Sequence, residues 1–90
     1  MYKIEFSNIA ISDIQKLRRN EPNAYKKLDS LISELKIHPT TGTGHPEQLK
    51  GDKSGQWSRH ITGKHRLIYE IKEEVVIVNV LSAYGHYGDK

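Results

Sequence analysis

The chain contains no cysteine, so disulfides, zinc–thiolate sites and cysteine nucleophiles are excluded. It has no apolar run that approaches the ~20 residues of a membrane-spanning helix. The N-terminal segment also lacks the apolar stretch of a signal peptide. Internal repeats and low-complexity tracts are absent from the sequence. These absences predict a soluble protein that is compatible with the cytoplasm.

The composition is that of a small folded domain. A length of 90 residues predicts one domain, residues 1–90, without room for a second core. A hydrophobic content of 36% and a charged content of 28% fit a globular chain better than disorder. The 14 basic residues outnumber the 11 acidic ones, which gives a formal net charge of +3. This mild excess favours an anionic partner without requiring one.

The first half of the chain predicts a strand followed by two helices. Residues 2–6 alternate and are rich in strand formers. Ser7 offers an N-cap to a helix over residues 8–19. Pro22 begins a second helix, whose apolar residues recur at helical spacing until Pro39 ends it. The break between the two helices is short, which predicts an antiparallel helical hairpin.

The second half predicts a loop over residues 40–47 and then strands over residues 57–62, 66–71 and 75–81. The β-branched residues of the last strand predict a central strand that is buried on both faces. The predicted fold class is therefore α+β. An antiparallel-rich β-sheet carries the N-terminal α-helical hairpin on one face, in the order β-α-α-β-β-β.

Alternation along the strands suggests a binding face. Leu67 and Tyr69 share one side of their strand and suit the helices, whereas Arg66 points to the opposite side. If the register permits, Arg59 and Arg66 meet on the helix-free face. Two neighbouring guanidinium groups repel each other, so this arrangement predicts an anion bound between them.

Three segments of the sequence resemble a known family when they are taken in order: HPEQLKG, WSRHITGKHRLIYEI and SAYGHY. The set resembles the YoeB/Txe branch of the RelE superfamily, the toxins of bacterial type II toxin–antitoxin modules, over nearly the whole chain. The resemblance implies a microbial-ribonuclease-like fold and metal-independent cleavage of messenger RNA on the translating ribosome. It implies a cognate antitoxin as partner and no cofactor, and it leaves a homodimer open.

The resemblance also implies three catalytic residues. Glu47 matches the general base of the family, His86 the general acid, and Arg66 the arginine that stabilises the charged phosphorus centre. These residue types suit RNA cleavage, because RNA supplies its own nucleophile, the 2′-hydroxyl. The reaction then needs only a base, an acid and positive charge at the phosphate.

Three further residues match those that bind RNA in the family. Lys50 and Arg59 match cationic residues that contact the RNA backbone, and Tyr87 matches the terminal aromatic that holds the substrate. Two features depart from the family. His60 stands where relatives often carry a second consecutive arginine, and residues 88–90 extend past the point where relatives tend to stop. Both departures concern contacts with the ribosome or the antitoxin.

Ordinary structural explanations exist for several of these residues. Each arginine can be a solvated strand residue or part of an ion pair. Trp57 and Tyr69 suit the core, and His60 and His65 suit structural or surface positions. His45 lies close to Glu47 in the sequence but is not predicted to act. The spacing of the histidines does not predict a metal site.

Two other functions stay open. One is a non-catalytic, ParE-like inhibitor of DNA gyrase on the same fold, which would not need the Glu47, Arg66 and His86-Tyr87 set. The other is a plain RNA-binding module, for which a denser basic face and more exposed aromatic residues are typical.

Overall fold

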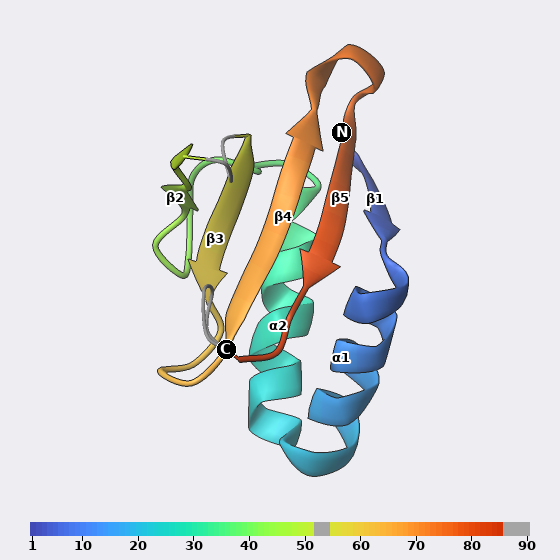
Figure 1. The fold of residues 1–90 in the computed structure, drawn as a ribbon, viewed down its shortest axis with the longest axis vertical. Helices are drawn as coiled ribbons and strands as arrows, with labels where there is room; N and C mark the ends of the chain where they lie inside the picture. Colours follow the sequence, from blue (N-terminus) through green and yellow to red (C-terminus); the bar gives the residue numbers. More distant parts are fainter. Residues whose placement is uncertain (52–54, 86–90) are drawn as a thin grey trace.

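The structure is a computed structural model that describes residues 1–51 and 55–85 (Figure 1). Its elements follow in the order β1 (Lys3–Phe6), α1 (Asn8–Asn20), α2 (Pro22–Leu35), β2 (Glu47–Gln48), β3 (Gln56–His60), β4 (Arg66–Lys72), the 3-10 helix η2 (Glu73–Val75) and β5 (Ile77–Ser82). The five strands form one sheet in the order β1-β5-β4-β3-β2. Only the β1–β5 pair within it is parallel. The predicted α+β class is confirmed.

The two helices begin where the local chemistry of the sequence predicts, and α2 ends at Leu35, before Pro39. The Ser7 hydroxyl caps α1 by accepting a hydrogen bond from the Ala10 amide at 3.0 Å, and it donates to the Leu81 carbonyl at 2.8 Å. Pro22 occupies the first turn of α2, where a missing N–H has no consequence. None of the helices in the described part of the chain is long and apolar enough to cross a membrane.

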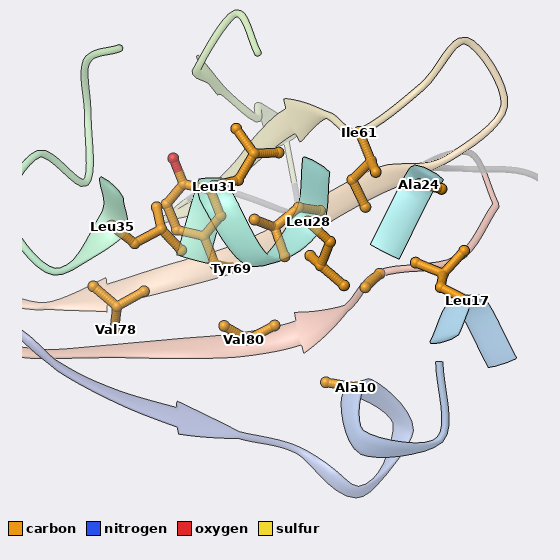
Figure 2. Packing of buried hydrophobic residues seen from close by; sticks show 12 residues of the cluster. Ala10, Leu17, Ala24, Leu28, Leu31, Leu35, Ile61, Tyr69, Val78 and Val80 are labelled. Atoms are coloured by element: carbon orange, nitrogen blue, oxygen red, sulfur yellow. The ribbon is translucent and has the colours of Figure 1, made fainter. Parts of the chain in front are cut away.

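The hydrophobic core is a single layer between the helices and one face of the sheet (Figure 2). Its buried residues include Ala10, Leu17, Leu28, Leu31 and Leu35 from the helices and Leu67, Tyr69, Val78 and Val80 from the sheet. Ile77 and Asn79 alternate with the two valines in β5 and are only half-buried. The prediction that this strand is buried on both faces is therefore wrong. β5 lies inside the sheet, between β1 and β4, but α1 and α2 cover the same face.

Strand β2 was not predicted. It consists of two residues that pair with Ser58 and Trp57 at the edge of the sheet. A strand this short has no alternation that a sequence pattern could reveal. Its pairing matters for the site, because it places Glu47 on the sheet rather than at the end of a free loop.

Candidate functional site

The register between β3 and β4 separates the two arginines. Arg59 pairs with Leu67, and His60 pairs with Arg66. Residues paired across two strands point to the same face of the sheet. Leu67 is fully buried under the helices, so Arg59 also faces the helices, while Arg66 points away from them. The prediction that both arginines meet on the helix-free face is wrong, because a register shift of one residue reverses the face that a side chain occupies.

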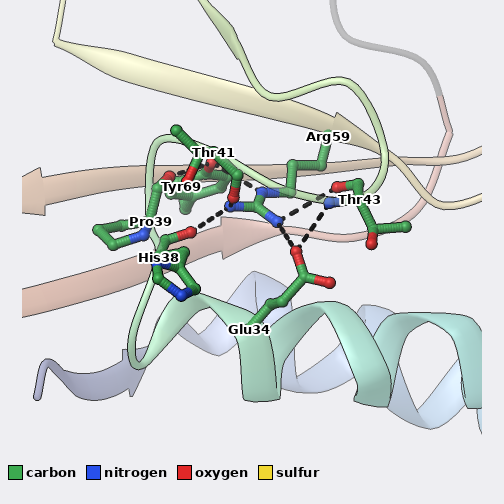
Figure 3. A network of polar contacts seen from close by, with 7 residues as sticks. All are labelled: Glu34, His38, Pro39, Thr41, Thr43, Arg59 and Tyr69. Atoms are coloured by element: carbon green, nitrogen blue, oxygen red, sulfur yellow. Dashed lines mark hydrogen bonds and ion pairs between the residues drawn. The ribbon is translucent and has the colours of Figure 1, made fainter.

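Arg59 lies at the centre of a buried polar network (Figure 3). Its side chain has no exposed surface. Its guanidinium donates to the carboxylate of Glu34, the hydroxyl of Tyr69 and the carbonyls of His38, Thr41 and Thr43. An arginine has five N–H donors, and these contacts engage all of them. The structure therefore contradicts the prediction that Arg59 contacts the RNA backbone.

This network fixes the loop that leads from α2 to Glu47. The Tyr69 hydroxyl donates to the Pro39 carbonyl at 2.7 Å, and the Thr43 amide donates to the Glu34 carboxylate at 2.8 Å. Hydrogen bonds from Thr43, followed by the contact with Arg59, lower the pKa of Glu34 below its ordinary value. Burial raises the pKa of Tyr69. Tyr69 is thus a core residue, as its place in the sequence predicts, and it helps to hold the loop.

The helix-free face brings two of the predicted catalytic residues onto neighbouring strands. Glu47 on β2 pairs with Ser58 on β3, and two residues further along β3 His60 pairs with Arg66 on β4. Neighbouring strands are about 4.8 Å apart, which puts the Cα atoms of Glu47 and Arg66 roughly 12 Å from each other. His60 lies between them. Both side chains are long enough to contact one phosphate placed over this part of the sheet.

A shallow hollow of about 470 Å³ opens beside Glu47, lined by His45, Pro46, Glu47 and His60. The rings of His45 and His60 meet edge to face, with 5.8 Å between their centroids. Gly44 makes the close approach of this loop possible, since a Cβ atom there would lie 2.9 Å from the His60 carbonyl oxygen. Its φ of 86° is also one that glycine adopts readily.

The hollow therefore contains two histidines for which the sequence predicted no role in the site. Part of the placement of His60 could have been inferred from the sequence. His60 follows Arg59 in a strand, so the two side chains must point to opposite faces. The placement of His45 could not have been inferred from the sequence, because it depends on a left-handed backbone with a φ of 54°.

Two of the three cations predicted to meet the substrate, Arg66 and Lys50, reach the surface of the molecule. Arg66 is half-buried, and its Nη1 donates to the carbonyls of Thr62 at 3.2 Å and His65 at 3.5 Å. Within residues 1–51 and 55–85, no group accepts a hydrogen bond from its Nε or Nη2. Lys50 is exposed just beyond β2 and forms no ion pair with a described residue. Both can therefore bind an anion.

His86 and Tyr87, the predicted acid and the predicted RNA-binding aromatic, lie outside the described residues. The chain that leads to them is placed, however. The carbonyl of Gly85, which belongs to the peptide bond before His86, accepts a hydrogen bond from the Arg66 amide at 2.8 Å. No cluster of three or more His, Cys, Asp or Glu residues in the described part of the chain is suited to hold a metal ion.

Known proteins resemble this chain in sequence and in fold. Residues 6–87 match the family described as YoeB-like toxin of bacterial type II toxin–antitoxin system. The toxin YoeB of Synechocystis is 34% identical over 85 residues, which cover 94% of this chain and 96% of the relative.

Solved structures agree with this match. The YoeB/ParE toxin from Agrobacterium tumefaciens superposes with a TM-score of 0.89 at 33% identity, covering 94% of this chain and 99% of that one. The toxin in a YoeB–YefM complex from Staphylococcus aureus gives 0.82 at 30% identity, covering 97% and 99%. The chain described here therefore belongs to the YoeB-like toxins of bacterial type II toxin–antitoxin systems.

Proposed function

We propose that this chain is a metal-independent endoribonuclease that cleaves messenger RNA on the translating ribosome. One observation carries the proposal. Glu47 and Arg66 lie on the same helix-free face, on either side of His60, and the peptide bond that precedes His86 is hydrogen-bonded to the Arg66 amide. A carboxylate and a cation on one face, with Gly85 bound to the backbone of the cation, support an RNA phosphate as the ligand of this surface.

In the proposed reaction Glu47 accepts the proton of the RNA 2′-hydroxyl. The 2′-oxygen then forms a bond to phosphorus, and the bond from phosphorus to the 5′-oxygen breaks. His86 protonates the leaving 5′-oxygen, so the products are a 2′,3′-cyclic phosphate and a 5′-hydroxyl. Arg66 stabilises the extra negative charge on the phosphate oxygens in the transition state. A positioned base or acid typically contributes about 10²–10⁴-fold each.

The ribosome has a physical role in this proposal. An ordinary carboxylate is a weak base at neutral pH, so acid–base chemistry alone gives a modest rate. Holding the 2′-hydroxyl in line with the phosphate removes much of the remaining barrier. We propose that the ribosome supplies this orientation, while exposed Lys50 and the aromatic Tyr87 hold the RNA against the toxin.

We further propose that a cognate antitoxin binds this chain, as YefM binds the related YoeB of Staphylococcus aureus. The chain is basic, with a formal net charge of +3, and an acidic antitoxin segment would complement it. Because Arg59 is buried, the segment would cover the face around His60 and Arg66 instead of a pair of arginines. RNA and antitoxin would then compete, and binding of both at once would contradict this mode of inhibition.

The test is a translation reaction in which messenger cleavage is mapped at nucleotide resolution. We would compare the wild type with Glu47→Gln, Arg66→Ala and His86→Gln. Glu70→Gln is the matched control, because Glu70 lies on the same face of β4 but bonds to Asn79, away from the hollow.

We expect the three site variants to lose cleavage by at least about 10²-fold, which is the lower end of what one acid or base contributes. The control variant should cleave like the wild type. All four variants should remain folded, and the control should bind antitoxin like the wild type. Translation that stops while the messenger stays intact would overturn the proposal and make a ParE-like action on DNA gyrase the next hypothesis to test.

A further inference from the structure

Three hydrogen bonds hold the chain where it leaves β5. The Ala83 amide donates to the carboxylate of Asp13 on α1 at 2.9 Å. The Gly85 amide donates to Nδ1 of His65 at 2.9 Å, and the Gly85 carbonyl accepts from the Arg66 amide at 2.8 Å. Residues 83–85 are thus fixed against α1 and against the turn between β3 and β4, at the lower end of the sheet in Figure 1.

The contact with Gly85 identifies the tautomer of the His65 ring. An amide N–H is always a donor, so Nδ1 must be the nitrogen without a proton. The ring proton is then on Nε2, which lies 2.9 Å from the Glu21 carboxylate and donates to it. The ring is fully buried and the Tyr84 ring packs on it, with 4.3 Å between the centroids. Glu21, at the joint between α1 and α2, therefore selects the tautomer that can hold Gly85.

We propose that His65 is a positioning residue, which together with Glu21 holds Gly85 beside the backbone of Arg66. This inference rests on the proposed endoribonuclease function, in which His86 is the acid. His86 follows Gly85 directly in the sequence, so a displacement of Gly85 moves the point from which the chain continues to the acid. A misplacement of about 1 Å can reduce a rate about 10²-fold.

Two substitutions separate the two hydrogen bonds of the ring. In His65→Asn the amide oxygen takes the place of Nδ1, so the bond to Gly85 is kept and the bond to Glu21 is lost. In His65→Gln the amide nitrogen takes the place of Nε2, so the bond to Glu21 is kept and the bond to Gly85 is lost. Both variants remove the same buried ring. A purely structural role predicts equal effects, whereas a positioning role predicts that His65→Gln is the more damaging.

The first readout is single-turnover cleavage of messenger RNA on ribosomes. We expect His65→Gln to lower the cleavage rate about 10²-fold with little change in half-saturation, and His65→Asn to restore most of that loss. The second readout does not depend on RNA. We expect nitrogen NMR of the wild type to find Nδ1 of His65 unprotonated, and the Gly85 amide to exchange slowly with solvent. In Glu21→Ala that amide should exchange faster.

Several results would overturn the inference. A proton on Nδ1 of His65 in the wild type, or a Gly85 amide that exchanges freely, would remove its structural basis even if neither variant of His65 folds. Equal loss of cleavage in the two variants, in step with their loss of thermal stability, would reduce His65 to a core residue. If the wild type does not cleave RNA but the NMR results are as expected, the proposed function is wrong, while the placement of Gly85 by His65 is supported.

Discussion

Replacing Arg59 with methionine tests whether the buried guanidinium organises the loop before β2. The substitution keeps an unbranched side chain but removes the charge and all five donors. It leaves the Glu34 carboxylate without its cation and three loop carbonyls without donors. Breaking a buried ion pair by removing one partner typically costs about 3–5 kcal/mol. The Glu34 side chain is 29% exposed, and water can replace part of the lost interaction, so we expect about 3 kcal/mol.

The free energy of unfolding can be measured in urea by the fluorescence of Trp57, the single tryptophan, which packs against the core. A loss of about 3 kcal/mol corresponds to a fall in Tm of about 12–24 °C in a domain of this size. Arg59→Lys keeps the charge but not the planar guanidinium with its five donors, so its loss of unfolding free energy should be intermediate. Arg66→Met is the matched control, because Arg66 is half-buried and, among the described residues, donates to two carbonyls. We expect it to lose less than about 1 kcal/mol.

The reasoning would be refuted if Arg59→Met lost no more stability than Arg66→Met. Such a result would mean that the network is as weak as an exposed ion pair, for which about 0–1 kcal/mol is typical. It would also mean that something other than Arg59 holds residues 38–43 in place. The position of Glu47 would then need another structural explanation.

Three further changes test other parts of the structure. Gly44→Ala should lower the unfolding free energy in urea by more than about 1 kcal/mol, because its Cβ would meet the His60 carbonyl. In Gly63→Ala the new Cβ would meet no atom of residues 1–51 or 55–85 within 4 Å, so this control should lose less stability. Glu34→Gln should flatten the dependence of Tm on pH. Because folding lowers the pKa of Glu34, the charged carboxylate stabilises the fold above its ordinary pKa of 4.5, and this stabilisation is lost as the pH falls through the folded-state pKa. A wild type that is as stable at pH 3 as at pH 7 would contradict the expectation. Ser7→Ala should cost about 1 kcal/mol in the same urea assay through loss of the α1 cap, and an unchanged midpoint would contradict that role.

The sequence by itself determined the local structure and the family. Ser7, Pro22 and Pro39 mark helix boundaries through side-chain capping, a fixed φ and a missing donor, and these effects act within a few residues. The apolar stripe of α2 follows from helical spacing in the same way. The order of the Glu47, Arg66 and His86-Tyr87 set resembled the YoeB toxins, and the family match confirms that identification.

Tertiary structure alone decided which of these residues share a face. Alternation states which residues of a strand point the same way, but only the register against the neighbouring strand states which side the helices cover. That register buries Arg59 and leaves His60 beside Arg66. The two-residue strand β2 and the hydrogen bond from Gly85 to His65 likewise join parts of the chain far apart in sequence. Such contacts depend on the packed fold, and no local pattern in the sequence encodes them.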